Sequence, residues 1–451
     1  MRPQRINGQY PDTMTDADTS RFARLAHGVA QIEKHELKAV ALAFLCNFVL
    51  LGCYYILRPL RDTMATLFGA GQLQNLFTLT FAATLVCAPI FSGLASRVKL
   101  TRFLPGVFWF WFFNVVGFYF LFSTAPQSRW VAGSYYVWFS VTNLFMISVF
   151  WSLMVDIFSS QQATRLFAVI AAGGSIGAIA GPVITRALVG AVGLSGLLLI
   201  AAGGLLVVIL LIHLLMREKA WLRREGDPVQ QSTLDHGLGG NPFDGFSTVL
   251  KSAFMMNQAA FMLLMTWIAT VAYFLQTDLI AKAFTDLAGR TQAIADIDLV
   301  VNICSALILT FGLSRFVQRC GVTWGLLLNP VLMVIAFLGV ALSPSLLMIQ
   351  AVQVVRRVSQ YAIARPSREI CFTVVSQENR YKAKNVIDTV VYRFGDVTAA
   401  WMQTGLKAAG FGMAGSISLG LLASGVWGTV ALALGRRYET LRARESGNNP
   451  L

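Results

Sequence analysis

The chain has 451 residues, of which 56% are hydrophobic and only 13% are charged, and its formal net charge is +14. About a quarter of the residues in a soluble globular chain are charged, so this composition excludes an ordinary soluble protein. Apolar stretches near or above the roughly 20 residues that cross a bilayer recur along the whole length, and they predict an all-α polytopic membrane protein.

Twelve such stretches follow one another along the chain. The predicted spans cover residues 38–64, 74–94, 103–123, 130–156, 164–186, 190–216, 260–281, 295–316, 321–341, 345–367, 385–408 and 411–435. The longest polar break separates the first six spans from the last six. The predicted organisation is therefore a tail (1–37), a first six-helix bundle (38–216), a central loop (217–258), a second six-helix bundle (259–435) and a final tail (436–451).

The basic residues are unevenly distributed among the connections. With the first tail inside, 25 of the 36 Lys and Arg residues lie in or beside cytoplasmic segments, and five lie in or beside external loops. Such a bias predicts that both termini are cytoplasmic. The positive charge then reflects topology and lipid contact, and no nucleic-acid polymer is expected as a partner. The cysteines and histidines lack metal-ligand spacing, so neither a metal nor a cofactor is expected, and we expect a monomer.

The two halves repeat two short polar patterns. The stretch GLASRVKLTR, from Gly93 to Arg102, and the stretch GLSRFVQRCG, from Gly312 to Gly321, are interpreted as tight basic turns on the cytoplasmic side. SQQATR after the fourth span is similar to SQENR after the tenth. Repeats at matching places are typical of transporters with two related halves. The basic turns resemble the loop signature of the major facilitator superfamily, which implies two pseudo-symmetric six-helix bundles.

The fifth span carries the sequence GGSIGAIAGPVI, in which Gly173, Gly177 and Gly181 recur every four residues. Such spacing presents a bare helix face for close packing. An alternative reading is a role in opening, because GAIAGP resembles a Gly-Pro signature of facilitator antiporters. In the polar break, NPFDGFSTVLKS predicts a short interfacial helix.

Ionisable residues at membrane depth normally face a water-filled cavity or a partner. The arginines counted in the deep parts of the spans are Arg58, Arg61, Arg356, Arg357, Arg365 and Arg393, and the acids counted there are Asp62 and Asp396. If Arg58 pairs with Asp62 and Arg393 with Asp396, four positive charges remain. An anion in a wet central cavity would relieve the cost of burying them, and the planar guanidinium suits phosphate or carboxylate.

Three patches combine charged residues with aromatic or small ones: ILRPLRDTMA in the first span, FWSLMVDIFSSQQATRLFAVIAAGG from Phe150 to Gly174, and REICFTVVSQENRYKAKNVIDTVVYRFGD from Arg368 to Asp396. These patches resemble the bacterial and plastid ATP/ADP translocases. The resemblance implies that Arg61 contacts substrate, that Asp156 is a cytoplasmic-side carboxylate and that Arg393 lines the cavity. After Arg-Phe-Gly the family tends to a lysine and small residues, whereas Asp396 follows here.

These observations predict a secondary transporter of the bacterial inner membrane that exchanges or imports an anionic, phosphorylated metabolite such as ATP or ADP. The expected substrate contacts are Arg58, Arg61, Asp62, Arg356, Arg357, Arg393, Asp396, Tyr54 and Tyr361. The residues expected to control opening are Gly93, Arg97, Asp156, Arg165, Gly177, Gly181, Pro182, Gly312, Arg315 and Arg380.

Three alternatives stay open at this point. One is a proton-coupled permease for another solute, with Asp62 or Asp396 as the proton carrier, and dependence on a pH gradient would distinguish it from strict exchange. A second is a non-transporting sensor or scaffold, which would have a dry, salt-bridged interior. The third is a membrane enzyme, and it is the least favoured because the sequence has no GxSxG, Walker-type or paired-carboxylate motif.

Overall fold

The computed structural model describes residues 32–33, 35–69, 71–97, 100–222, 244–376, 379–380, 383–384 and 386–445. Most of the predicted first tail, half of the predicted central loop and the last six residues lie outside these ranges. Within the described residues the chain is helical, without strands. The predicted helical fold class is thereby confirmed.

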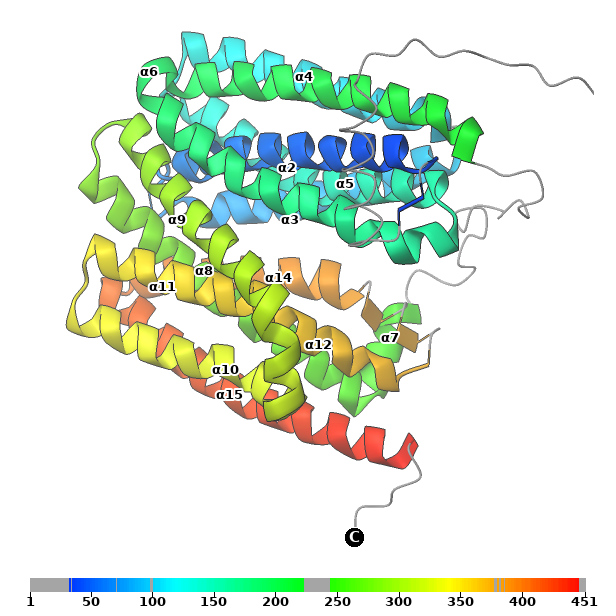
Figure 1. Ribbon diagram of the computed structural model, residues 1–451. Helices are drawn as coiled ribbons and strands as arrows, with labels where there is room; N and C mark the ends of the chain where they lie inside the picture. Colours follow the sequence, from blue (N-terminus) through cyan, green and yellow to red (C-terminus); the bar gives the residue numbers. More distant parts are fainter. Residues whose placement is uncertain are drawn as a thin grey trace, which may run out of the picture.

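The first half forms five long helices (Figure 1). They are α2 (Leu37–Ala65), α3 (Leu73–Arg97), α4 (Leu100–Thr124), α5 (Arg129–Ile157) and α6 (Ser160–Leu222). The 63-residue α6 contains two predicted spans, because Gly193 has a φ of 67° and breaks the helix between them. Glycine adopts this left-handed conformation without steric cost. The six predicted spans of this half therefore all fall on helices.

The second half begins with a short helix and continues with longer ones. The elements are α7 (Asp244–Lys251), α8 (Ala253–Ala283), α9 (Leu287–Leu307), η1 (Ile308–Gly312), α10 (Leu313–Leu342), α11 (Leu346–Ser359), η2 (Gln360–Ala364), α12 (Arg365–Cys371), η3 (Phe372–Val374), η4 (Val386–Val391), α14 (Tyr392–Ala408) and α15 (Gly412–Glu445). η1, η2 and η4 are π-helical, and η3 is a 3₁₀ turn. The six predicted spans of this half also fall on helical segments, and α7 is the predicted short helix.

Nine helices in the described residues are long and apolar enough to cross a membrane, and one of these is α6 with its two spans. The tenth and eleventh predicted spans fall below that threshold. They contain several arginines, together with glutamines at 353, 360 and 403, and these residues lower the hydropathy of both spans. These two polar spans both contribute residues to the candidate site.

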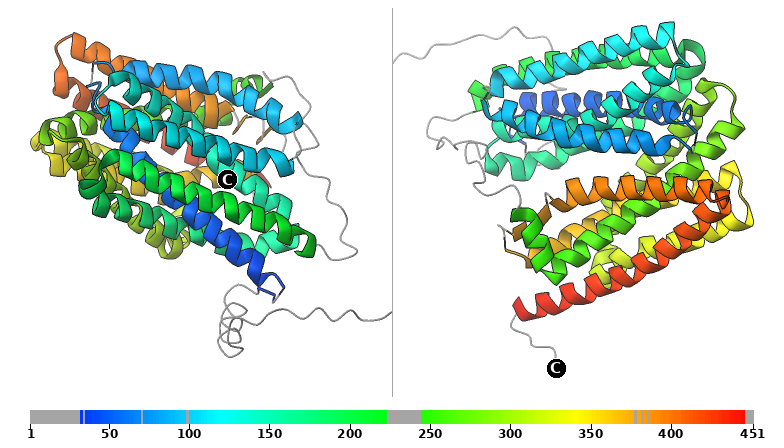
Figure 2. Two further views of the ribbon diagram at one scale, coloured as in Figure 1. Left: turned by 90° about the horizontal axis from the view of Figure 1, so that it is seen from above. Right: turned by 180° about the vertical axis from the view of Figure 1, so that it is seen from behind.

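The two halves form separate bundles, each with its own hydrophobic core. One core is built from residues of α2 and α4–α6, and the other from residues between Val249 and Tyr438. Figures 1 and 2 show the bundles side by side, with α9 crossing the boundary between them. The start of α2, the short α7 and the end of α15 lie at the same end of the molecule.

The glycine face of α6 packs against α2. A Cβ added to Gly177 would lie 2.1 Å from the carbonyl oxygen of Phe48, and one added to Gly181 would lie 2.6 Å from that of Gly52. Only residues without a side chain allow two helix backbones to approach so closely. The packing interpretation of this motif is confirmed, while a role for Gly177, Gly181 and Pro182 in opening stays a prediction.

The predicted tight turns starting at Gly93 and Gly312 were wrong in position. Gly93 lies inside α3, which stays helical to Arg97, and Gly312 is the last residue of the π-helical η1 that runs directly into α10. In the second repeat the helix breaks instead at Gly321, whose φ is 83°. The helices continue through the basic residues because arginine is a good helix former. The side chain of Arg97 lies outside the described part of the structure.

Candidate functional site

A cavity of about 1190 Å³ lies between the two bundles. Its charged lining consists of Arg58, Arg61, Asp62, Arg356, Arg357, Arg365, Arg368, Glu369, Lys384, Asp388, Arg393 and Asp396. Tyr54 and Tyr361 line it as well. Every arginine that the sequence placed deep in a span therefore reaches this one cavity, as do both acids counted with them. The substrate roles assigned to these residues stay predictions.

The α2 helix carries three charged side chains into the cavity. They are Arg58, Arg61 and Asp62. Because residues three and four positions apart are neighbours on a helix surface, all three lie on one side of α2. The Nε of Arg61 donates to Oδ1 of Asp62 at 2.8 Å, and the hydroxyl of Tyr273 from α8 donates to the same oxygen at 3.1 Å. The Arg61 guanidinium also lies 5.3 Å from the ring centre of Tyr136. Asp62 is therefore held by both bundles.

Arg58 does not pair with Asp62, contrary to one reading of the sequence. Its Nη1 lies 3.1 Å from Oδ1 of Asp298 in α9, and Nη1 of Arg357 in α11 lies 2.5 Å from the same oxygen. The side chain of Asp298 is fully buried. One carboxylate thus joins an arginine of the first bundle to an arginine of the second, through partners 240 residues apart in the chain.

The sequence reasoning overlooked Asp298, although a signal was present. It stands within the eighth predicted span (295–316) in the run IADIDLVV, beside Asp296. An acid in an apolar run is a candidate functional residue by its cost alone. Asp296 has a different partner, since its Oδ1 lies 3.1 Å from Nη1 of Arg186 in α6, and both side chains are more than one-third exposed.

Asp298 changes the charge balance that the sequence predicted. The six deep arginines face three acids rather than two, so their surplus is three positive charges and not four. Including the outer residues of the cavity, eight cations face four lining carboxylates and the buried Asp298. The cavity keeps a net positive charge.

Arg356 and Arg365 carry most of this surplus. The guanidinium of Arg356 donates to Oε1 of Gln353 at 2.9 and 3.1 Å and to Oε1 of Gln360 at 2.9 Å. Arg365 is exposed to the cavity and lies 5.5 Å from the ring centre of Tyr361. Within the described residues, neither arginine has a carboxylate partner. Neutral amides position Arg356 without cancelling its charge.

On α14, Arg393 and Asp396 form the predicted pair at 3.5 Å. The hydroxyl of Thr270 donates to Asp396 at 3.2 Å, and Arg393 also donates to the backbone carbonyl of Ser140 in α5 at 3.2 Å. A Cβ at Gly395 would lie 2.0 Å from the Thr266 hydroxyl oxygen, so α14 lies directly against α8. Arg393 is therefore a further link between the bundles.

The cavity reaches the end of the molecule where α12 and α7 lie (Figure 1). There the buried Arg368 pairs with Asp388 at 2.7 Å and with Glu369 at 3.3 Å, and Lys384 pairs with Glu369 at 2.5 Å. The Nε and Nη1 atoms of Arg368 are buried without a hydrogen-bond partner. These outer charged residues of the second bundle line the same cavity as the inner arginines.

At the opposite end, where α2 terminates, the bundles are in contact. A small apolar cluster there combines Leu73 and Tyr136 of the first bundle with Phe274 and Ala400 of the second. The hydroxyls of Thr63 and Thr291 lie 2.8 Å apart across the same boundary, and Arg290 donates to Thr66 at 2.8 Å. These contacts close the cavity at this end.

The other residues expected to control opening lie away from the cavity lining. Arg165, at the start of α6, donates to Glu36 at 2.9 Å, and Gln162 donates to the same carboxylate at 3.0 Å. Burial acts to raise the pKa of Glu36, but these bonds and the backbone N–H of Glu33 outweigh it and hold the pKa below its ordinary value. The SQQATR motif therefore connects α6 to the start of α2.

The backbone N–H of Arg380 donates to the backbone carbonyl of Ser376. Arg315 donates to the backbone carbonyl of Phe311 at 3.2 Å. The gating roles of Asp156, Arg165, Arg315 and Arg380 stay predictions. Among the described residues, no group of three His, Cys, Asp or Glu side chains is arranged to hold a metal ion.

Comparisons with known proteins agree with this architecture. Several solved transporters share the fold: a bacterial homologue of the iron transporter ferroportin (14% identity, 88% of this chain and 99% of that chain, TM-score 0.62), the nucleoside transporter NupG (14%, 91% and 99%, 0.58), and a bacterial homologue of the lysosomal transporter Spinster (15%, 93% and 99%, 0.56). The chain is thus a multi-pass membrane protein with the fold of the major facilitator transporters.

The sequence relationship is more specific. The chain is 21% identical over 474 aligned positions to ADP,ATP carrier protein 1 of Chlamydia pneumoniae, and the alignment covers 87% of this chain and 89% of that protein. No protein-family model matches the chain. The chain therefore has the fold of the major facilitator transporters and a distant sequence relationship to an ADP,ATP carrier.

Proposed function

We propose that this protein is a secondary transporter for an anionic, phosphorylated metabolite, with exchange of nucleotides such as ATP and ADP as its leading activity. The observation that carries the proposal is the positive surplus of the cavity between the bundles. Burying a charged group without a counter-charge costs several kcal/mol per ion, even after the protein relaxes around it. A bound polyanion would supply the missing negative charge.

The arginines divide into two groups by their partners. Arg356 and Arg365, without carboxylate partners among the described residues, are the first contacts we assign to a phosphate chain. Arg58 and Arg357 share Asp298, and a phosphate oxygen can replace that carboxylate because guanidinium groups bind both through paired hydrogen bonds. Asp298 then acts as an internal anion that occupies these arginines when no substrate is bound.

The same contacts connect substrate binding to movement of the bundles. The bonds Arg58–Asp298, Tyr273–Asp62 and Arg393 to Ser140 all cross the boundary between the bundles. In alternating access, the bundles rock around a site at mid-membrane. A substrate can drive this change only by binding one arrangement better than another. Competition for Arg58 and Arg393 provides that difference.

The direction of opening follows from the predicted topology. The start of α2 and the end of α15 lie at the end of the molecule towards which the cavity extends, and the charge bias of the loops predicts that this end is cytoplasmic. The described arrangement is then inward-open in the bacterial inner membrane. Labelling of single cysteines introduced at residues 128 and 444 with a membrane-impermeant reagent in intact cells tests this orientation.

Exchange in proteoliposomes tests the proposed function directly. Vesicles loaded with unlabelled ADP and containing the wild-type protein should accumulate labelled ATP, while empty vesicles should not. The double variant Arg356→Gln, Arg365→Gln should lower uptake at least about 100-fold, because two charge-assisted hydrogen bonds contribute about 1.5–3 kcal/mol each. Arg436→Gln, an exposed arginine near the end of α15, is the matched control and should leave uptake unchanged. Full exchange by the double variant would contradict the assignment.

A proton-coupled permease is the second candidate, because Asp396 lines the cavity and its 3.5 Å ion pair is the longest among the inner acids. At this distance the Arg393 guanidinium holds the Asp396 carboxylate only weakly, so Asp396 can bind a proton instead. In that case, an imposed pH gradient would drive uptake into vesicles that contain no internal substrate, and Asp396→Asn would abolish the response. Exchange predicts no uptake under that condition.

A further inference from the structure

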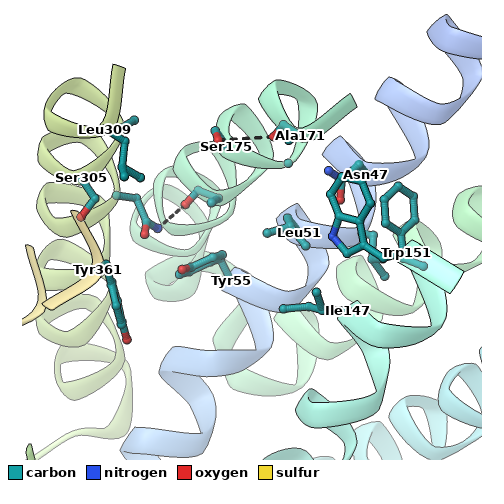
Figure 3. A pocket seen from close by; sticks show the side chains of 16 residues that line it. Asn47, Leu51, Tyr55, Ile147, Trp151, Ala171, Ser175, Ser305, Leu309 and Tyr361 are labelled. Atoms are coloured by element: carbon teal, nitrogen blue, oxygen red, sulfur yellow. Dashed lines mark hydrogen bonds between the residues drawn. The ribbon is translucent and has the colours of Figure 1, made fainter. Parts of the chain in front are cut away.

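A second, smaller pocket opens beside the arginine cavity. Its volume is about 270 Å³, and it lies between α2, α5 and α6 of the first bundle and α9 and η2 of the second. Leu51, Tyr55, Ile147 and Tyr361 line both spaces, so the pocket is a side chamber of the cavity. Figure 3 shows Ser305 and Tyr361 on one side of it, Trp151 on the other, and Tyr55 between them.

The chemistry of the side pocket differs from that of the cavity. No charged residue is among those that line it. Tyr55, Tyr361 and Trp151 offer aromatic surfaces, and two polar side chains come from one face of α9. Asn302 donates its Nδ2 to the carbonyl of Ala178 at 2.6 Å, which leaves Oδ1 as an acceptor, and the buried Ser305 hydroxyl has no hydrogen-bond partner. Ser305 is only 8% exposed.

The buried Ser305 hydroxyl without a hydrogen-bond partner points to a ligand in this pocket. A buried hydroxyl in a native structure normally has a protein or water partner. An acceptor at Asn302 and a free hydroxyl one turn later at Ser305 match a group that presents a hydrogen-bond donor beside an acceptor. The surrounding rings and aliphatic side chains favour a flat, neutral ligand group, as in small-molecule sites where a few polar atoms orient a mostly apolar contact.

The rings that enclose the side pocket also contact the arginines. The Arg58 guanidinium carbon lies 5.8 Å from the ring centre of Tyr55, and those of Arg357 and Arg365 lie 6.0 and 5.5 Å from the ring centre of Tyr361. The neutral pocket and the cationic cluster are thus separated by the thickness of one side chain. A single ligand with an aromatic group joined to phosphates by a pentose can contact both.

We propose that the side pocket binds the base of a nucleotide whose phosphates occupy the arginine cavity; this proposal rests on the proposed function and specifies its substrate. An amino-substituted base such as adenine fits the polar atoms. Its exocyclic amine donates to Oδ1 of Asn302, its neighbouring ring nitrogen accepts from the Ser305 hydroxyl, and its faces pack against Tyr55 and Tyr361. Asn302 and Ser305 would then determine base specificity.

Equilibrium binding to the purified full chain in detergent tests the assignment with three probes: ATP, purine riboside triphosphate, which lacks the exocyclic amine, and inorganic tripolyphosphate. The wild-type protein should bind ATP at least about tenfold more tightly than tripolyphosphate, because base stacking on aromatic side chains contributes on this scale. Purine riboside triphosphate should lie between the two.

Variants of α9 separate the base from the phosphates. Ser305→Met fills the pocket and should weaken ATP binding about tenfold or more while tripolyphosphate binding stays unchanged. Asn302→Leu should remove the preference for ATP over purine riboside triphosphate, because Asn302 receives the exocyclic amine. The milder Ser305→Ala should weaken the binding of both nucleotides by a similar factor, because both keep the ring nitrogen. Val300→Met is the matched control, because Val300 lies on the same helix with 44% of its surface exposed, and it should change nothing. Retained tripolyphosphate binding shows that each variant is folded.

Each possible outcome either supports or overturns the proposed base site. Equal affinity for ATP and tripolyphosphate in the wild-type protein, or unchanged ATP binding in Ser305→Met, would overturn the base site and leave the anion cavity standing. Parallel loss of ATP and tripolyphosphate binding in the pocket variants, with Val300→Met unaffected, would also overturn it. If the wild-type protein binds none of the three probes, the proposed function fails, and the base site fails with it.

Discussion

The two bundles hold their charged residues in different ways. In the first bundle, α2 is clamped by the glycine face of α6, and its arginines Arg58 and Arg61 each contact a carboxylate. In the second, Arg356 is held by glutamines and Arg365 lies beside a tyrosine. The described π-helical segments, η1, η2 and η4, also belong to the second bundle. The first bundle therefore supplies a closely packed wall whose arginines have carboxylate partners, Arg58 through Asp298 of the second bundle, and the second bundle also supplies arginines without such a partner.

Backbone geometry strengthens this contrast. A π-helical turn leaves the regular hydrogen-bond pattern of the α-helix and is frequent at functional sites. Here η2 carries Tyr361, directly between Arg356 and Arg365, and η4 precedes Arg393. The irregular segments thus lie beside the arginines that we assign to substrate. Irregular backbone and arginines without a carboxylate partner thus occur together in the second bundle, opposite the closely packed contact of α2 with α6.

The largest expected effect comes from removing the carboxylate that the two bundles share. Asp298→Asn leaves Arg58 and Arg357 buried without a counter-charge and should lower the free energy of unfolding by about 3–5 kcal/mol. If the anion cavity is correct, saturating ATP should restore part of this loss and raise the unfolding temperature more in the variant than in the wild type. Thermal unfolding in detergent, with and without ATP, measures both effects.

Asp296→Asn is the matched control for that experiment. Asp296 is two residues away on α9, but its ion pair with Arg186 is much more exposed, so its loss should change stability by less than about 1 kcal/mol. Equal effects of the two substitutions would show that Asp298 is not the shared anchor of the bundles.

A smaller effect is expected from the packing of the first bundle. Gly177→Ala would place a Cβ within 2.1 Å of a backbone oxygen of α2, and such overpacking typically costs about 1–3 kcal/mol. Gly190→Ala, where the added carbon meets nothing within 4 Å, should be neutral or slightly stabilising. Unfolding curves of both variants measure the difference. A tolerated Gly177→Ala would mean that the first bundle is not the rigid wall of the comparison.

The smallest effect concerns the start of α2. Because the folded-state pKa of Glu36 is lowered, its contribution to stability is present above the ordinary value of 4.5 and is lost as the pH falls through the folded-state pKa. Glu36→Gln should therefore destabilise the protein near neutral pH, by about 1 kcal/mol or less, and this difference should shrink below pH 4.5. Unfolding of the two proteins between pH 6 and pH 3 tests the sign. A difference that grows with acidity would contradict it.

Local sequence predicted most of the helices, but it did not predict the contact between Asp298 and Arg58. Runs of apolar residues determine where helices lie, so the predicted spans fall on helical segments. The helix breaks at Gly193 and Gly321 and the π-helical turns depend on tertiary packing. The arginines were predictable because their burial is costly wherever they stand. Their pairing was not, since Asp298 meets Arg58 across 240 residues of chain.

A structure of the protein with ATP bound, determined by electron cryo-microscopy in nanodiscs, tests the central claim most directly. The account predicts density for the phosphate chain between Arg356 and Arg365, with Arg58 or Arg357 moved from Asp298 towards it. A cavity that stays empty at saturating ATP, with both arginines still on Asp298, would contradict the claim that the positive surplus serves to bind an anion.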